Sequence, residues 1–231
     1  MAPGDLPSSP SVKSRPTVMK YQSARYLING MSPGELLANR IRDEASVQAN
    51  ILKVNSFLNH QVDTHLMSVC GHELARRFRG LEITKVFTGF GSGLMPAQCC
   101  AMHLNVPLVF ATDNAPLAKP GSEIFSAAIG NSSAGRNFGS MHVSAEFIGP
   151  GDRLLVIDDM LSKGGTIVCL AELAAKAGAV IVACGFLIEK EYEGGRLAVS
   201  KALYLKRERV QSIVRIASIT DGHINIQTDD Y

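Results

Sequence analysis

Long apolar runs alternate with amphipathic stretches through most of the chain, and this alternation predicts an α/β fold. Unbroken apolar runs of strand length are typical of strands buried on both faces of a parallel sheet, and stretches with a helical period separate them. We predict strands over 83–90, 106–111, 152–159 and 179–189, and helices over 94–104 and 166–177. Strands and helices in this order predict a doubly wound, mostly parallel sheet with helices on both faces.

The chain before this alternating region is predicted to contain two helices and a short strand. Ser32 is suited to the N-cap of a helix, Pro33 to its first position, and Glu35 completes a capping box. These residues predict a helix that ends near residue 45. A strand at 51–54 and a second helix over 65–78 are expected to follow.

The last segment is predicted to form a hairpin. Two apolar runs, 210–219 and 223–228, flank the turn-forming sequence Thr220-Asp221-Gly222. A short turn of this composition between two strand-like runs is typical of antiparallel pairing. We therefore expect the hairpin at one edge of the sheet.

Residues 1–31 fall outside the pattern. They contain several prolines and serines before any amphipathic period begins, which predicts a disordered extension in front of one domain over 32–231. The extension is basic and nearly free of acidic residues, so an organellar targeting peptide is an alternative. Its prolines would interrupt the amphipathic helix that such peptides need.

Residues 112–140 also lack a clear period and are rich in glycine, serine, alanine and asparagine. Loops of this length inside a compact domain usually have a function or are disordered. We expect this segment, called the hood below, to be flexible and to order over a bound substrate. A two-stranded surface excursion without a role is the alternative.

Composition narrows the classes of protein to consider. The 231 residues carry a net charge of +2, which argues against nucleic acid as the main partner. No apolar run approaches the ~18–20 residues that span a bilayer, so a protein that does not enter the membrane is expected. Five cysteines without CxxC spacing fit reduced thiols in the cytoplasm, and six scattered histidines argue against a structural metal site.

The stretch LLVIDDMLSKGGT, residues 154–166, combines two acids with a glycine-rich loop. Asp158 and Asp159 end a predicted strand, and ligands of open parallel sheets bind beyond the carboxyl ends of strands. Paired glycines let backbone N–H groups approach an anion, and the N-terminus of the next helix adds partial positive charge. The stretch is therefore suited to a sugar that carries a phosphate and two neighbouring hydroxyls. An acid that caps a helix after an ordinary turn is the alternative.

This stretch resembles the phosphoribosyl-diphosphate motif of the type I phosphoribosyltransferases. The resemblance implies that Asp158 and Asp159 hold the ribose 2′- and 3′-hydroxyls. It implies a phosphate loop for the 5-phosphate made of Ser162, Lys163, Gly164, Gly165 and Thr166. It also implies a diphosphate loop made of Gly91, Ser92 and Gly93, and a Mg²⁺ ion that accompanies the diphosphate and is reached by the two acids only indirectly.

Residues 51–63, ILKVNSFLNHQVD, resemble the amino-terminal signature of the xanthine phosphoribosyltransferases. GSGLMPA, HVSAEFI and LIEKEYEGGR follow in that family's order. The resemblance implies that Leu52 and Asn59 line a purine pocket and that Lys190 faces the 2-oxo group of xanthine. An ammonium group only donates hydrogen bonds, which suits a carbonyl. The alternatives are that Lys190 is a solvated charge and that Asn59 caps a helix beginning near Val62.

The chain departs from the family's pattern at three places. Phe90 stands where an acid is common, Thr112-Asp113 where an Arg-Lys pair is usual, and Lys163 where Thr or Asn is usual. The missing basic pair removes positive charge expected near the diphosphate. Its substitutes would be the basic residues of the hood, Lys119 or Arg136.

The resemblance as a whole implies a cytoplasmic, homodimeric purine salvage enzyme with Mg²⁺ as its cofactor. It would join xanthine, or another 6-oxopurine, to 5-phosphoribosyl 1-diphosphate and release diphosphate. Two alternatives stay open at this point. One is a regulatory protein of the same fold that binds 5-phosphoribosyl 1-diphosphate without turnover, and the other is an enzyme that uses adenine.

Overall fold

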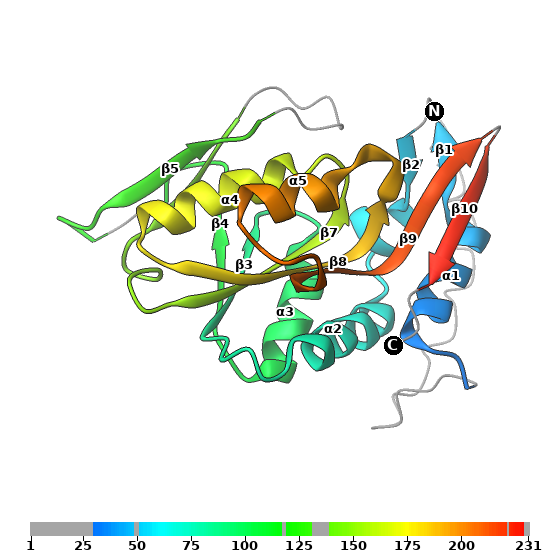
Figure 1. Ribbon diagram of the computed structural model, residues 1–231, viewed down its shortest axis with the longest axis horizontal. Coiled ribbons are helices and arrows are strands. Elements are labelled where there is room, and N and C mark those ends of the chain that lie inside the picture. Colours follow the sequence, from blue (N-terminus) through cyan, green and yellow to red (C-terminus); the bar gives the residue numbers. More distant parts are fainter. Residues whose placement is uncertain (1–29, 49–50, 117–118, 131–138, 221, 229–231) are drawn as a thin grey trace, which may run out of the picture.

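A computed structural model describes residues 30–48, 51–116, 119–130, 139–220 and 222–228 (Figure 1). Its centre is a six-stranded sheet in the order β10-β9-β8-β7-β3-β4. All neighbouring pairs are parallel except β10 with β9. The strands are β3 (Lys85–Gly89), β4 (Leu108–Ala111), β7 (Arg153–Leu161), β8 (Val180–Lys190), β9 (Val210–Thr220) and β10 (His223–Thr228). The predicted α/β fold with a mostly parallel sheet and an edge hairpin is confirmed.

Helices cover both faces of the sheet. Figure 1 shows α2 and α3 beneath it and α4 and α5 above it. The helices are α1 (Pro33–Glu44), α2 (Thr64–Phe78), α3 (Leu94–Leu104), α4 (Gly165–Lys176) and α5 (Gly195–Ala202). Each face has its own apolar cluster, one with α1, α2 and α3 and one with α4 and α5. Because the middle strands are buried from both sides, they read as continuous apolar runs in the sequence.

The first two helices begin at residues that accept hydrogen bonds from their first turns. The Glu35 N–H donates to Ser32 Oγ at 3.2 Å, and the Ser32 N–H donates to the Glu35 carboxylate at 2.7 Å, so the predicted capping box is present. Asp63 caps α2, accepting from the N–H groups of His65 and Leu66 at 3.1 and 3.0 Å. The alternative in which Asn59 caps a helix near Val62 is therefore wrong.

Several short elements lie where no periodic pattern indicated them. The predicted strand at 51–54 is β2 (Ile51–Lys53), and it pairs with β1 (Ser46–Gln48), which we did not predict. The turn η1 (Asn55–Asn59) follows β2. Helix α5 and the turns η2 (Glu191–Glu193) and η3 (Arg207–Arg209) were also missed. Each is too short to show a helical period.

The described part of the hood contains the strand β5 (Ile124–Ala128), which pairs antiparallel with β6 (Ser140–Ser144), a strand that begins at the last residue of the hood. The ammonium of Lys176 in α4 donates to the Ser126 carbonyl at 2.5 Å, and Thr112 and His142 exchange backbone hydrogen bonds at 2.9 Å. The hood is thus tied to α4 and to the end of β4. Residues 117–118 and 131–138 lie outside the described residues, as does the predicted extension up to residue 29.

The chain reverses its direction of winding between β3 and β7. It leaves β3 through α3 and returns as β4 on one side, and it leaves β7 through α4 and returns as β8 on the other. Crevices at such a switch point, outside the carboxyl ends of the strands, are the usual ligand sites of open α/β sheets. No helix among the described residues has the length and apolar character needed to cross a bilayer.

Candidate ligand-binding site

A cavity of about 460 Å³ lies at the carboxyl ends of β3 and β7, at the switch point of the sheet. Every candidate site residue from the sequence lines it, although the residues come from five separate segments of the chain. These are Leu52, Asn59, Gly91, Ser92, Gly93, Asp158, Asp159, Ser162, Lys163, Gly164, Gly165, Thr166 and Lys190. The fold therefore brings the two glycine-rich loops, the acids and the lysine to one place.

Asp158 and Asp159 lie in the part of β7 that is paired with only one neighbouring strand. On one side β7 stays paired with β8, where Asp158 lies opposite Phe186. On the other side its pairing with β3 ends at Val156. We predicted that the strand would end at residue 159, but β7 continues to Leu161. The acids are therefore held by a strand on one side and open to the cavity on the other.

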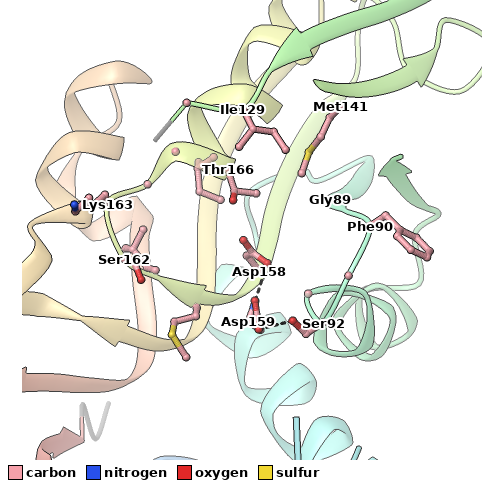
Figure 2. Close-up of a pocket in the computed structure, with 18 of the residues that line it drawn as sticks. Gly89, Phe90, Ser92, Ile129, Met141, Asp158, Asp159, Ser162, Lys163 and Thr166 are labelled. Carbon is pink, nitrogen blue, oxygen red and sulfur yellow. Dashed lines mark hydrogen bonds between the residues drawn. The ribbon is translucent and has the colours of Figure 1, made fainter. Parts of the chain in front are cut away.

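Short contacts hold the two carboxylates (Figure 2). The Ser92 hydroxyl donates to Asp159 Oδ2 at 2.6 Å, and the Asp159 N–H donates to Asp158 Oδ1 at 3.0 Å. Gly93 lies directly against Asp158, because a Cβ on it would stand 2.4 Å from Asp158 Oδ1. Only glycine allows the start of α3 to come this close to the carboxylate.

Partial burial makes the charge of Asp158 costly. Loss of water contact raises the pKa of its carboxyl well above the usual range, and the neighbouring charge of Asp159 raises this pKa further. The ionised form is therefore favoured by anything that donates hydrogen bonds to it or brings positive charge. A vicinal diol is one such group, since each hydroxyl can donate to one carboxylate.

The phosphate loop presents backbone N–H groups to the cavity. Gly164 stands at the N-cap of α4 with φ +84°, a conformation that favours glycine. Within the described residues no side chain caps this helix, so the N–H groups of its first turn face the cavity and suit an anion. The Lys163 side chain points away from the acids (Figure 2), so this departure leaves the backbone of the loop accessible.

The diphosphate loop, residues 91–93, faces the phosphate loop across the acids (Figure 2). Phe90 just before it turns its ring away from Asp158 and Asp159 and toward Phe110, with ring centroids 6.3 Å apart. Both rings are substantially exposed, at 56% and 42%. The substitution of an acid by Phe90 thus adds an apolar group beside the loop and no charge to it.

The other end of the cavity combines an apolar wall with a buried cation. Leu52 is 4% exposed, and Asn59 lies at the exposed rim. The Lys190 side chain is 7% exposed, and its ammonium lies 3.4 Å from Glu193 Oε1. Lys190 is therefore not a solvated charge, and the alternative that we gave for it is wrong.

Little positive charge surrounds the loops. Among the described lining residues the only cations are Lys163 and Lys190, and Asp113 adds a carboxylate. Lys119 does not line the cavity and instead pairs with Glu146, its ammonium 3.2 Å from Oε2. Arg136, the other candidate substitute, lies outside the described residues. Thr112 pairs with His142 and does not line the cavity.

Sequence reasoning missed the apolar residues that complete the cavity. They are Ile51, Ile129, Met141, Met160, Leu161 and Ile167. Ile129 of the hood and Met141, directly after it, lie over the acids and Thr166 (Figure 2). Gly89 lies so close to Met141 that a Cβ on it would stand 2.9 Å from Met141 Cε. Ile51 and Met160 adjoin predicted site residues, but nothing in the sequence marked Ile129 or Met141.

The donors in this cavity suit a Mg²⁺ ion that arrives with its ligand. Within the described residues no cluster of three or more His, Cys, Asp or Glu side chains could hold a metal alone. Mg²⁺ is commonly bound by one or two carboxylates together with water and substrate phosphates. Asp158 and Asp159 supply carboxylate oxygens beside two loops suited to phosphate groups, so the residues present fit this ion.

Similar proteins were found by sequence and by structure. The chain is 38% identical to the xanthine phosphoribosyltransferase of Shouchella clausii over 82% of its own length and 92% of that protein. It is 40% identical to that of Geobacillus thermodenitrificans over 84% and 97%. Its fold matches a Giardia lamblia APRTase solved with 9-deazaadenine at TM-score 0.63 and 19% identity, covering 80% of this chain and 98% of that one. No family model matches the chain.

Asp158→Asn is expected to stabilise the protein at neutral pH. The folded state binds the Asp158 proton more tightly than the unfolded state, so the ionised carboxylate costs stability above its raised pKa. We expect the thermal midpoint of the variant to rise by about 2–4 °C near pH 7.5. The gain should shrink as the pH falls through the raised pKa of the wild type, where Asp158 becomes neutral.

Differential scanning calorimetry of both proteins between about pH 5 and pH 8 measures this. Asp43→Asn on the exposed side of α1 is the control, because it makes the same change in net charge far from the cavity. A gain that does not vary with pH, or that the control reproduces, would contradict the prediction.

Proposed function

Because the chain belongs to the family of xanthine phosphoribosyltransferases, we propose that it joins xanthine to 5-phosphoribosyl 1-diphosphate. The products are the nucleoside 5′-monophosphate and diphosphate. One observation carries the proposal. A pair of adjacent carboxylates, a helix N-terminus with a glycine cap and a buried lysine line the same cavity. Each of these suits a different part of the two substrates.

The acids and the two loops each bind a different part of the sugar diphosphate. Asp158 and Asp159 accept hydrogen bonds from the ribose 2′- and 3′-hydroxyls. The phosphate loop binds the 5-phosphate through the N–H groups at the start of α4. The diphosphate loop, residues 91–93, binds the diphosphate through its own backbone. The acids lie between these loops, as the ribose lies between the two phosphate groups of the substrate (Figure 2).

The reaction is a displacement at the ribose C1. A purine nitrogen forms the new bond to C1 and gives up its proton to solvent, while the bond from C1 to the diphosphate oxygen breaks and the diphosphate leaves with that electron pair. The chain binds the two substrates side by side, which removes much of the entropy cost of the reaction. Bound Mg²⁺ would neutralise part of the charge on the diphosphate. Asp158 and Asp159 also place negative charge near C1, which becomes positive in the transition state.

Lys190 supports xanthine as the base. Its ammonium group only donates, and xanthine presents a carbonyl at position 2 where adenine has no acceptor of this kind. The group is buried and lines the same cavity as Leu52, with Glu193 as its ion-pair partner. A base without the 2-oxo group would lose a charge-assisted hydrogen bond there. The site therefore favours a 2-oxopurine over adenine.

The proposed enzyme is a homodimer. Phe90 and Phe110 form an exposed aromatic pair beside β4, the open edge of the sheet, and Met102 is 71% exposed. Pairing of two copies would cover apolar surface of this kind. We place the enzyme in the cytoplasm because its five cysteines are free thiols. A monomer in light scattering at micromolar concentration would contradict the dimer.

Incubation with xanthine, 5-phosphoribosyl 1-diphosphate and Mg²⁺ tests the function directly. We expect xanthosine 5′-monophosphate and diphosphate to form in equal amounts. Chromatography of the reaction mixture measures both products. The doubly substituted Asp158→Asn, Asp159→Asn protein is the control and is expected to form no product. It should also lose the thermal stabilisation that the sugar diphosphate with Mg²⁺ gives the wild type. Normal turnover by this variant would overturn the role of the acids.

Lys190→Met should change the base preference. The substitution keeps the length of the side chain and removes its charge, so the loss falls on the base with a 2-oxo group. We expect kcat/KM for xanthine to fall by an amount equivalent to about 1–3 kcal/mol. The value for hypoxanthine, which lacks the 2-oxo group, should change little.

Steady-state kinetics with both bases measures this difference. Lys206→Ala is the control, because Lys206 is an exposed lysine, 83% accessible, that does not line the cavity. An equal loss for xanthine and hypoxanthine would mean that Lys190 has a structural role only.

A further inference from the structure

Helix α5 supports the phosphate loop from behind. Gly195 at its first position lies against the backbone of the loop, since a Cβ on Gly195 would stand 2.0 Å from the Ser162 carbonyl oxygen. A second contact lies one turn further along the helix, where a Cβ on Gly164 would stand 2.8 Å from Val199 Cγ2. The backbone path of the phosphate loop therefore depends on where α5 begins.

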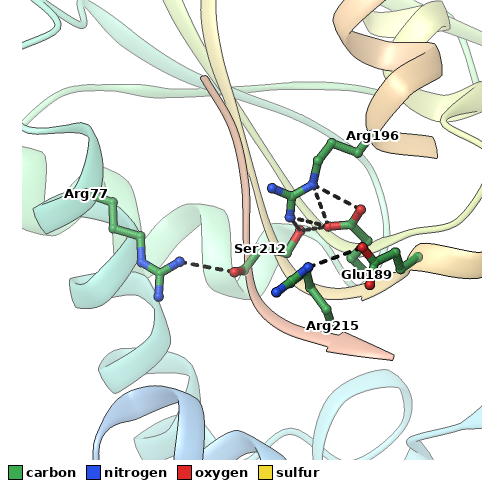
Figure 3. Close-up of polar contacts among 6 residues, drawn as sticks. Arg77, Glu189, Arg196, Ser212 and Arg215 are labelled. Carbon is green, nitrogen blue, oxygen red and sulfur yellow. Dashed lines mark hydrogen bonds and ion pairs between the residues drawn. The ribbon is translucent and has the colours of Figure 1, made fainter. Parts of the chain in front are cut away.

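A buried ion pair joins the first turn of α5 to β8. Glu189 in β8 is 2% exposed and accepts from Arg196 in the first turn of α5 (Figure 3). Arg196 Nε lies 3.1 and 3.0 Å from the two carboxylate oxygens, and Nη2 donates to Oε2 as well. Ser212 of β9 donates its hydroxyl to the same carboxylate at 2.7 Å. The two partners thus meet in a fixed geometry and not as a loose pair.

The polar contacts of Glu189 continue through Ser212 to the other face of the sheet. The Ser212 carbonyl accepts from Arg77 Nη1 of α2 at 3.1 Å (Figure 3). Arg77 Nε in turn donates to Glu73 Oε1 at 2.7 Å. The Arg77 side chain is 4% exposed. Glu189 is therefore held through β9 by a helix on the opposite face, which makes it a rigid point of attachment for Arg196.

Glu189 does not line the cavity, whereas the next residue, Lys190, does. Successive side chains of a strand point to opposite faces, so β8 directs one residue to the base and the other to α5. A buried ion pair contributes little net stability compared with well-packed apolar residues. The pair therefore calls for an explanation other than stability.

We propose that Glu189 is a positioning residue for the sugar phosphate. By holding Arg196, it fixes the first turn of α5 against the Ser162 carbonyl and keeps the N–H groups of the phosphate loop directed at the 5-phosphate. The proposal rests on the proposed function of the cavity. It assigns to Glu189 an effect on the binding of the sugar substrate and none on the recognition of the base.

Glu189→Gln tests this through a difference between the two substrates. The amide keeps the shape of the side chain but removes the charge that orients Arg196. A displacement of about 1 Å in the groups that position a substrate can lower the reaction rate by a factor of roughly 100. We expect KM for 5-phosphoribosyl 1-diphosphate to rise about tenfold or more, while KM for xanthine stays within about twofold. Calorimetric titration with ribose 5-phosphate should show the same weakening without turnover.

A second variant approaches the same contact from the other side. Gly195→Ala forces the Ser162 carbonyl to move, since no room exists for a Cβ. It should reproduce the pattern of Glu189→Gln, although it leaves the ion pair in place. If Glu189→Gln does not fold, the double variant Glu189→Gln, Arg196→Gln removes both charges and leaves no unpaired one, and the same pattern is expected.

Glu191→Gln is the matched control. Glu191 lies two residues from Glu189 and pairs with Arg215 at 3.2 Å, outside the contact between α5 and the loop. Its removal should leave both KM values unchanged. A structural role for Glu189 alone would lower the thermal midpoint without separating the two KM values, and that result would overturn the proposal.

The outcomes separate this proposal from the proposed function. A wild-type protein that forms no nucleotide and does not bind ribose 5-phosphate would overturn both. An active wild type whose Glu189→Gln variant binds ribose 5-phosphate as tightly as before would overturn only the role of Glu189. Equal increases in KM for the base and the sugar substrate would overturn it too.

Discussion

This site depends on two negative charges, those of Asp158 and Asp159, that lie side by side near the carboxyl end of the central strand β7. Neighbouring carboxylates repel each other, and the loss of water around Asp158 adds to the cost of its charge. The surrounding structure offsets part of this cost. Ser92 donates to one carboxylate, the Asp159 N–H donates to the other, and β7 stays paired with β8 along this stretch. The part of the cost that is not offset favours ligand binding. A ligand that donates hydrogen bonds to these carboxylates binds more tightly, because the protein itself does not fully satisfy their charges.

The other parts of the cavity follow from this constraint. The acids are open to the ligand because β3 separates from β7 after Val156, although β3 stays paired with β4 as far as Gly89. Gly93 is small because the carboxylate of Asp158 occupies the space of its side chain. The phosphate loop begins directly after β7, which places it within reach of the same sugar.

The sequence predicted the elements with a strong period and the loops with a specific composition. Strands β7 and β8 read as apolar runs because both of their faces are buried, and α3 was placed with its correct bounds. The cavity's glycines and acids carry their chemistry in local sequence, so they could be found without the fold. The apolar walls could not, because Ile129 of the hood and Met141 directly after it are ordinary apolar residues that only the chain's path brings over the acids. Helix α5 was missed since eight residues show hardly two turns.

The line of polar contacts from α2 through β9 and β8 to α5 has a consequence for motion. A loop attached to the core can open only when the core loosens. Its opening is therefore as infrequent as large-scale unfolding, and much less frequent than the motion of a surface segment. Substrates nevertheless have to enter and products to leave on the time scale of turnover. Entry and release therefore have to proceed by movements of other parts of the cavity wall, and not of the phosphate loop.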